Sequence, residues 1–561
     1  MFTRITRSGG REYLQLVESY RNDAGAPRQR VIATLGRLDQ LQAASLDPLI
    51  RGLQRAAGSV AHAATPESSL PQVSFERALA FGDVFALNAL WIDLGLGDAI
   101  RRALRSSRRS FDAEALVRAM VFNRLCAPDS KLGCLEWLET VSIPGMPGAV
   151  THDQLLRTMD ALMDHAEAVE ARVAAQLRPM LDQQLSVVFY DLTTIRIHGE
   201  GDVANDLRAY GLNKETGGIA RQFLLGVAQS AEGLPLMHTV HAGNVSETKT
   251  LKAMLATVLK RFPVERVIVV ADRGLLSIDN ITELSTIATE TKRQLQFILA
   301  VPARRYRELG GTLDALAFDP DRPSLSEGKF AGHRLIIAHD PVRAAEQSAR
   351  RRKKIAEIEA FADKLVNKLD AQDAGQTERG RKASDRGAFS RFQSAVAEAK
   401  LTRFVRADYQ AERFSYDLNE TAIEDAERFD GKLALLTNVT DFSAEQIVSR
   451  YKSLADIERG FRVLKSDIEI APVFHRLPER IRAHALICFL ALVLHRVMRM
   501  RLRASGSKLS PNAALKALRL VQKLELTIRS QPATRTSRID ATQRSLLTDL
   551  RLKPPAENSL L

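Results

Sequence analysis

The sequence predicts an α/β protein built around a mixed sheet, with some strands buried on both faces. Residues 186–195 and 267–271 are nearly continuous apolar runs, as expected for strands that are covered on both sides. Two further strands, at 223–228 and 236–241, are separated by a short polar turn that ends at Gly233, which is typical of a hairpin. The predicted core therefore combines hairpin-linked strands with strands of the α/β type.

The chain is long enough for several domains, since it has 561 residues and domains commonly hold about 100–200. A Pro- and Ser-containing stretch at 63–71 indicates a linker, and a charged segment interrupts the core pattern further on. We expect six regions: a small β unit with linker at 1–70, a helical region at 71–180, the first part of the core at 181–302, an inserted α+β domain at 303–430, the second part of the core at 431–510 and a basic helical tail at 511–561.

Composition indicates a negatively charged partner. The chain carries 80 Lys and Arg against 67 Asp and Glu, a net charge of +13, which favours nucleic acid over a membrane surface. The cysteines Cys126, Cys134 and Cys488 are too few for a disulfide framework and lack zinc-site spacing, so we expect a cytoplasmic location. The first residues lack the apolar core of a signal peptide, and the apolar stretch 485–498 is too short to span a bilayer. We expect no membrane association and interpret that stretch as a buried helix.

Two N-terminal regions have features of DNA-binding modules. Residues 3–36 alternate between apolar and polar residues with glycine turns, which predicts an antiparallel unit of two or three strands. Its many arginines suit either a phosphate backbone or a solvated sheet face. Further on, Ser110 is expected to cap a helix that Pro128 ends, with a second helix at 132–140. The two helices suit a helix-turn-helix-like module, and a plain helical bundle is the alternative.

Three acidic residues indicate chemistry. Asp191 lies inside the first apolar run, where a buried carboxylate without a partner costs several kcal/mol. Asp272 directly follows the second run, at the strand edge where α/β proteins gather ligands. Glu458 lies on a predicted helix after the inserted domain. Three carboxylates that meet can hold two Mg²⁺ ions, or Mn²⁺ in their place, about 3.5–4 Å apart, and such a pair promotes phosphodiester cleavage.

The order of these acids resembles that of the DDE transposases of bacterial insertion sequences. In the branch with an inserted domain, the last acid lies in a Y-x2-R-x3-E-x6-K signature. Tyr451, Glu458 and Lys465 stand at those spacings in the predicted helix 447–465, whereas Leu454 replaces the arginine. Other similar segments are Tyr190-Asp191-Leu192-Thr193-Thr194, Gly233-Leu234-Pro235, Gly243-Asn244, Ala271-Asp272-Arg273-Gly274 and, more loosely, 31–36 and 123–137.

The resemblance implies an RNase H-like core and a DNA transposase that cleaves insertion-sequence ends and transfers them into target DNA. It implies that Asp191, Asp272 and Glu458 are catalytic and ligate two Mg²⁺ ions. It also implies a double-stranded DNA partner, in the form of terminal inverted repeats and target, and a homodimer on that DNA. The residues expected to bind DNA are Tyr451, Lys465, Arg273, Lys452 and Arg462.

Two other functions fit parts of the sequence. The basic first 180 residues suit a sequence-specific DNA-binding regulator without catalysis, which leaves Asp191 and Asp272 without a role. Asp191-Leu192-Thr193 after an apolar strand is similar to the haloacid-dehalogenase phosphatases, but nothing after 437 supplies the later strand with paired acids that this family needs. Magnesium-dependent nicking of a duplex that carries an element end separates the three functions.

Overall fold

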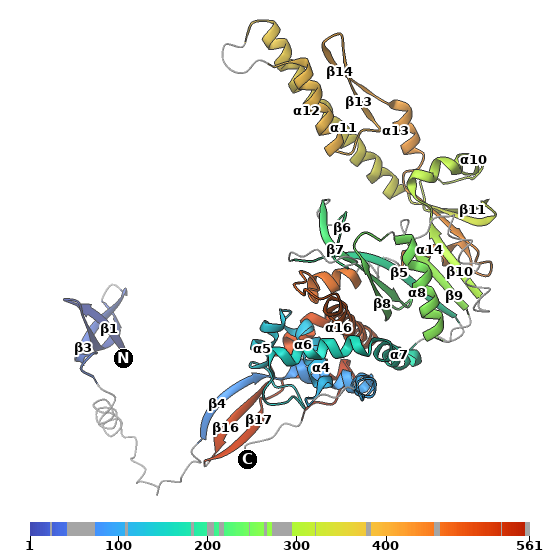
Figure 1. The fold of residues 1–561 in the computed structure, drawn as a ribbon. Coiled ribbons are helices and arrows are strands. Elements are labelled where there is room, and N and C mark those ends of the chain that lie inside the picture. Colours follow the sequence, from blue (N-terminus) through green and yellow to red (C-terminus); the bar gives the residue numbers. More distant parts are fainter. Residues whose placement is uncertain are drawn as a thin grey trace. The chain divides into compact units, whose positions relative to one another are not determined.

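The structure is a computed structural model of the chain (Figure 1). It describes residues 1–22, 25–41, 73–106, 110–180, 185–198, 207–212, 218–245, 247–262, 266–271, 294–319, 321–376, 383–453, 460–528 and 530–555. The predicted linker at 63–71 lies outside these residues.

The N-terminal unit is a three-stranded antiparallel sheet, as predicted. It contains β1 (Phe2–Ser8), β2 (Arg11–Arg21) and β3 (Pro27–Arg37), in the order β1-β2-β3. Gly9 and Gly10 form the first turn with positive φ angles, which glycine adopts without steric cost. Among the described residues of this sheet only Val17 is fully buried, so the unit is a thin layer without a core of its own.

The helical region that follows begins with a strand. β4 (Val73–Ala80) belongs to a three-stranded sheet of order β17-β16-β4, with β16 (Gln522–Ile528) and β17 (Gln531–Thr536). The predictions of a wholly helical region from 71 and of a helical tail from 511 are therefore wrong, since each region also contains strands. β4 pairs with a segment more than 400 residues away in the sequence. Such a distant pairing cannot be predicted from hydrophobic periodicity, which is a local signal.

The helices of this region form one layer of the main core. They are α2 (Gly82–Asp93), α3 (Leu96–Ala103), α4 (Ala113–Cys126), α5 (Lys131–Leu138), α6 (His152–Asp164) and α7 (Ala166–Leu177). The cap of α4 is Asp112, whose carboxylate accepts a hydrogen bond from the Ala115 amide at 3.1 Å. The predicted cap, Ser110, is therefore two residues too early.

The central sheet mixes antiparallel and parallel strands. It contains β5 (Leu185–Arg196), β7 (Ile219–Gln229) and β8 (Pro235–Ala242), which are antiparallel neighbours. On the other side of β5, β9 (Arg266–Ala271) and β10 (Gln294–Ala300) continue the sheet in parallel. The mixed sheet, the N-terminal β unit and the helical layer confirm the predicted fold class and are consistent with an RNase H-like core.

Four shorter strands extend this sheet. β6 (Ala209–Leu212) joins β7, and β15 (Lys432–Thr437), β12 (His333–His339) and β11 (Ser324–Phe330) continue beyond β10. The inserted domain was expected from 303, but β11 and β12 are hydrogen-bonded members of the central sheet. The apolar side chains of β12 complete the main core, which is why this part of the expected insertion belongs to the sheet.

A separate small core lies within the inserted region. α11 (Pro341–Asp373) and α12 (Asp385–Glu398) pack against each other and against the hairpin of β13 (Val405–Gln410) and β14 (Arg413–Leu418). Phe392 is fully buried among them, and this cluster of apolar side chains is distinct from the main core. α13 (Glu420–Glu427) leads back to β15. The remaining short elements before β11 are η3 (Ala303–Leu309) and α10 (Gly310–Asp314).

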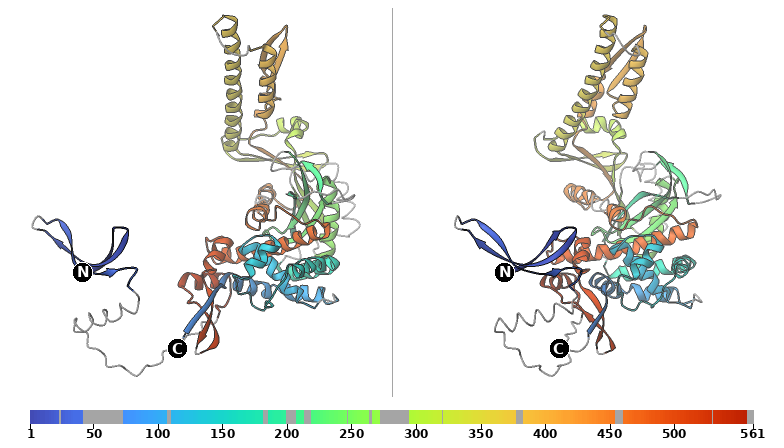
Figure 2. Two further views of the ribbon diagram at one scale, coloured as in Figure 1. Left: turned by 60° about the vertical axis from the view of Figure 1, so that its left-hand side comes forward. Right: turned by 90° about the vertical axis from the view of Figure 1, so that its left-hand side faces the viewer.

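The long apolar helix α16 (Pro478–Ala504) is the centre of the main core, as predicted. By length and composition it passes a test for membrane spans, but 94% of its most apolar window is buried inside the protein. It packs against α4, α6 and β8 (Figure 2). α8 (Glu247–Arg261) also contacts β8, and α17 (Pro511–Leu518) and α18 (Ala541–Asp549) complete the described elements of the C-terminal part.

The predicted helix 447–465 is not one continuous α-helix. α14 (Ala444–Lys452) ends at Ser453, whose amide donates to the carbonyl oxygens of Ser449 and Arg450. Further on, η4 (Val463–Asp467) is a π-helical turn, in which the Ile468 amide donates to the Val463 carbonyl. The helix that was predicted to carry both Tyr451 and Lys465 therefore does not keep regular α-helical geometry up to Lys465.

Candidate active site

The strand that carries Asp191 lies at the centre of the sheet. β5 is hydrogen-bonded to β7 over Phe189–Arg196, with Asp191 opposite Val227. Its first half is paired with β9, and the last pair in that parallel register is Phe189 with Val270. Counted along the sequence, Asp191 and Asp272 each come two residues after this pair. The side chain of Asp191 and the whole of Asp272 lie outside the described residues.

The residue before Asp191 fixes the backbone of β5. Tyr190 is fully buried, and its hydroxyl lies 3.3 Å from Thr239 Oγ1 and 3.2 Å from Thr250 Oγ1. Gly226 on β7 leaves the space for this phenol, since a Cβ there would meet the hydroxyls of Tyr190 and Thr239. The hydrogen bonds join β5 to β8 and α8, so that the backbone next to Asp191 is held from several directions.

A second group of contacts joins β9 to the segment before α14. Arg266, the first residue of β9, donates to both carboxylate oxygens of Asp441 at 2.5 and 2.6 Å. This ion pair lowers the pKa of Asp441, mainly through the hydrogen bonds from Arg266. The guanidinium groups of Arg266 and Arg450 lie 5.3 and 4.5 Å from the centre of the Phe442 ring. The two chain segments that precede Asp272 and Glu458 are therefore fastened together.

The predicted DNA-binding residues are only partly described. Tyr451 and Lys452 are the last two residues of α14; Tyr451 is half-buried against the main core and Lys452 is exposed. Arg462 is exposed directly before η4, and Lys465 lies half-buried within it. Glu458, Leu454, Asp272 and Arg273 lie outside the described residues. Within the described ranges, no three His, Cys, Asp or Glu side chains are grouped so that they could hold a metal ion.

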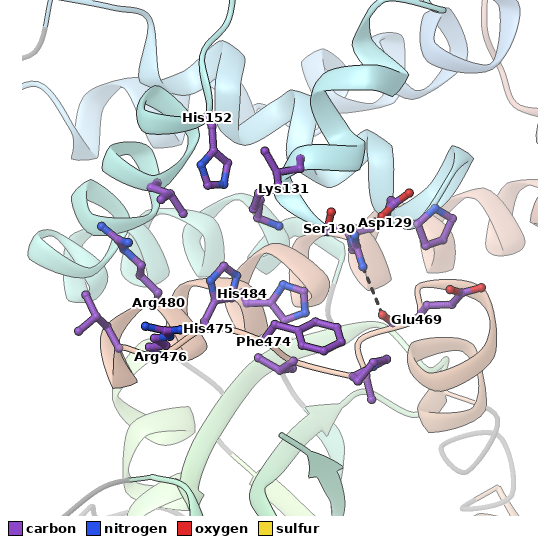
Figure 3. Close-up of a pocket in the computed structure, with 18 residues that line it drawn as sticks. Asp129, Ser130, Lys131, His152, Glu469, Phe474, His475, Arg476, Arg480 and His484 are labelled. Carbon is purple, nitrogen blue, oxygen red and sulfur yellow. Dashed lines mark hydrogen bonds between the residues drawn. The ribbon is translucent and has the colours of Figure 1, made fainter. Parts of the chain in front are cut away.

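Sequence reasoning missed a basic cavity of about 600 Å³ that the structure places between the helical layer and the chain before α16 (Figure 3). Its cationic lining residues are Arg124, Lys131, Arg476 and Arg480. His152, His475 and His484 line it as well. The Nε2 of His484 lies 3.0 Å from the Ile470 carbonyl oxygen. The only signal in the sequence was the loose similarity at 123–137.

Comparison with known proteins gives two family matches. The profile of the transposase DDE domain matches residues 182–494, and that of the N-terminal domain of IS1634 family transposases matches residues 2–65. Among solved structures, the Drosophila P element transposase strand transfer complex is 11% identical. That match covers 75% of this chain and 94% of the other, with a TM-score of 0.19. No curated protein matches the chain.

Proposed function

The chain belongs to the DDE transposases, since the family profile spans residues 182–494, and from this premise we propose that Asp191, Asp272 and Glu458 form its catalytic triad. As a member it is a DNA transposase, an enzyme that binds DNA and uses divalent metal ions. Neither the regulator without catalysis nor the phosphatase has support from the comparisons. We propose, in addition, which residues are catalytic, which metal ions they bind and how the protein assembles on DNA.

The parallel register of β5 and β9 is the observation that carries the assignment. Phe189 pairs with Val270, and neighbouring parallel strands stay in register from residue to residue. Because Asp191 and Asp272 both follow by two residues, continuation of this register would make them neighbours. The contacts of Arg266 with Asp441 and Phe442 support the third member, since they join the segment just before α14 to the first residue of β9.

The donor set fits hard divalent cations. Three carboxylates supply oxygen ligands, which suit Mg²⁺ or Mn²⁺ and not a structural zinc site. We assign two Mg²⁺ ions to Asp191, Asp272 and Glu458; when bound, they would lower the pKa of an attacking hydroxyl and stabilise the leaving oxygen. No nucleophilic side chain is needed, because the attacking groups are water in the first cut and the freed 3′-hydroxyl in strand transfer.

The remaining predicted residues would bind the DNA backbone. Lys452 and Arg462 are exposed cations beside the proposed triad in the sequence, so they are suited to phosphate oxygens. We assign Tyr451, Lys465 and Arg273 to phosphates or sugars near the cleaved end, as the family signature implies. We further propose that the protein acts in the bacterial cytoplasm, at terminal inverted repeats and target DNA, as a homodimer that joins two ends.

Replacing Asp191 tests the assignment. Asp191→Asn removes a ligand charge with almost no change of volume, so strand cleavage should fall by about 10³-fold or more. DNA affinity should stay within about threefold of the wild type, because the contacts to phosphates remain. The assay is Mg²⁺-dependent nicking of a duplex made from the DNA that flanks the coding sequence.

The matched control is Asp321→Asn, which makes the same change at an exposed turn before β11. It should cleave like the wild type. Cleavage by the Asp191→Asn protein at the wild-type rate would reject the assignment of Asp191, whatever the control does.

A further inference from the structure

The basic cavity is assembled from five chain segments. Its wall is made by the end of α4, the start of α5, the start of α6, residues 469–477 and the first turns of α16 (Figure 3). The first three segments precede residue 165 and the other two follow residue 468, so the two groups are far apart in the sequence. The cavity therefore exists only in the folded protein.

Positive charge exceeds negative charge in this cavity. Within the described part of the chain, its acidic lining residues are Asp129 and Glu469, against four Arg and Lys side chains. Of those four, Arg480 is already paired with Asp160, at 2.8 and 2.9 Å. The carboxylate of Asp129 is turned to its own helix start, where it accepts from the Ser130 amide.

Two of the cations are buried without a carboxylate partner. Lys131 is 6% exposed and Arg124 is 4% exposed. Among the described residues no acid forms an ion pair with Lys131. The guanidinium of Arg124 donates to the Glu469 carbonyl oxygen at 3.2 Å and to Asn123 Oδ1 at 3.4 Å, both neutral groups, and its Nε has no hydrogen-bond partner. A buried cation is costly unless it is paired, so the arrangement is suited to an anion that enters from outside.

The neighbouring imidazoles add polar groups without adding charge. Burial, together with the positive charges of Lys131, Arg480 and Arg124, lowers the pKa of His475 to about 4. Burial also lowers the pKa of His484 well below its usual range. Both rings are therefore neutral near pH 7. The single N–H of the neutral His484 ring is donated to the Ile470 carbonyl oxygen, so only His475 offers an N–H to a ligand.

The cavity wall is joined directly to the strand that carries Asp191. The His198 amide, just past the end of β5, donates to the Val473 carbonyl at 2.9 Å, and Ile197 and Val473 form a β-bridge. Phe474, at the mouth, is 65% exposed, and its ring centre lies 5.3 Å from that of His198. An exposed aromatic ring beside buried cations suits a nucleotide, since bases stack on such rings.

We propose that this cavity binds a phosphate group of the DNA substrate, with Lys131 and Arg124 at its base, Arg476 at its mouth and Phe474 against the adjoining nucleotide. The assignment rests on the proposed function in that its ligand is the DNA of the transposition reaction. It concerns residues outside the triad and its signature.

DNA affinity, measured without cleavage, tests the proposal. Fluorescence anisotropy in EDTA would follow the full-length protein on a duplex of flanking DNA between 50 and 200 mM salt, a range of about fourfold. Arg476→Gln and Lys131→Met should each weaken binding several-fold and reduce the slope of log K against log salt by about 0.9, the change for one lost phosphate contact. Arg503→Gln, an exposed arginine near the end of the same α16, is the matched control and should change neither.

Two further arms identify the source of the phosphate. Duplexes with and without a 5′-phosphate distinguish a strand end from the internal backbone. If the cavity binds the phosphate at a strand end, Arg476→Gln should weaken binding of the duplex with a 5′-phosphate and leave binding of the other unchanged; if it binds the internal backbone, both should weaken equally. Phe474→Ala should weaken DNA binding but leave unchanged any thermal stabilisation by inorganic phosphate. Unchanged salt slopes in both the Arg476→Gln and Lys131→Met proteins would overturn the proposal.

Stabilisation by inorganic phosphate with unchanged DNA affinity in these variants would also overturn it, in favour of a free anion. Because Arg476 is exposed, its variant should fold, so Arg476→Gln alone is enough to test the proposal. The readout is independent of the triad, since an Asp191→Asn protein that binds and does not cut would leave these slopes intact.

Discussion

The sheet around Asp191 and the basic cavity handle charge in opposite ways. At the sheet, buried neighbours such as Tyr190 fix the backbone of β5, and the cations Arg266 and Arg450 are held by Asp441 and Phe442. In the cavity, Lys131 and Arg124 are buried, and no carboxylate in the described part of the chain forms an ion pair with them. This difference agrees with the two proposals, in which the first region would bind cations and the second an anion.

The largest effect expected from this contrast is the change in the free energy of unfolding when Lys131 is replaced. Burial, followed by the charge of Arg124, lowers its pKa from 10.5 to about 8. Because the folded protein binds this proton less tightly than the unfolded chain, the cost is complete below pH 8 and is relieved as pH rises from about 8 to 10.5. Lys131→Met should therefore stabilise the protein at pH 7, by up to about 3 kcal/mol at 1.36 kcal/mol per pKa unit.

Urea unfolding of the wild type and the Lys131→Met protein, at pH 7 and again near the top of that window, would measure this. The advantage of the variant should shrink as pH rises. A structural lysine would behave differently: its loss would destabilise the protein at every pH, and the contrast between the two regions would fail.

The next effect concerns the rigidity of β5. Gly226→Ala places a methyl group against the hydroxyls of Tyr190 and Thr239, and overpacking of a core costs about 1–3 kcal/mol. The midpoint of thermal unfolding should fall by several degrees. Gly310→Ala, at a glycine with open space around it, is the control and should leave the midpoint nearly unchanged. Equal midpoints for the two variants would show that Tyr190 does not hold this strand.

The smallest effect should come from the ion pair that fastens β9. Arg266 and Asp441 are 19% and 52% exposed, so solvent screens the pair, and Asp441→Asn should cost under about 1 kcal/mol. Its pKa is lowered in the fold, so the contribution is present above the ordinary pKa of an aspartate and is lost as pH falls below it. The single-turnover rate of DNA cleavage by the Asp441→Asn protein should nevertheless fall several-fold, even where the protein remains fully folded. A rate equal to that of the wild type would limit the pair to a structural role.

Features with a local pattern could be predicted from the sequence. The buried strands β5 and β9, the hairpin of β7 and β8, the N-terminal sheet and the buried helix α16 all follow from apolar periodicity and turn residues. The family followed from the order of the acids. The assignment of Asp191, Asp272 and Glu458 as metal ligands stays a prediction.

Features that depend on distant pairing could not be predicted. β4 looked helical because its partner β16 lies at the other end of the chain, and β12 looked like part of an insertion although β15 pairs with it. The end of α14 depends on local hydrogen bonds that the Ser453 amide donates to Ser449 and Arg450, and the spacing of residues in the sequence does not reveal them. The cavity was invisible because Lys131 and His475 are brought together only by folding.

Iron-directed cleavage of the protein tests the central claim most directly. Fe²⁺ replacing Mg²⁺ at the site would, with ascorbate and peroxide, cut the backbone beside its ligands, and mass spectrometry would map the cuts. The account predicts cuts near Asp191, Asp272 and Glu458 together, all suppressed by excess Mg²⁺ and all lost in the Asp191→Asn protein. Cuts near one of the three alone, or cuts that persist in that variant, would contradict it.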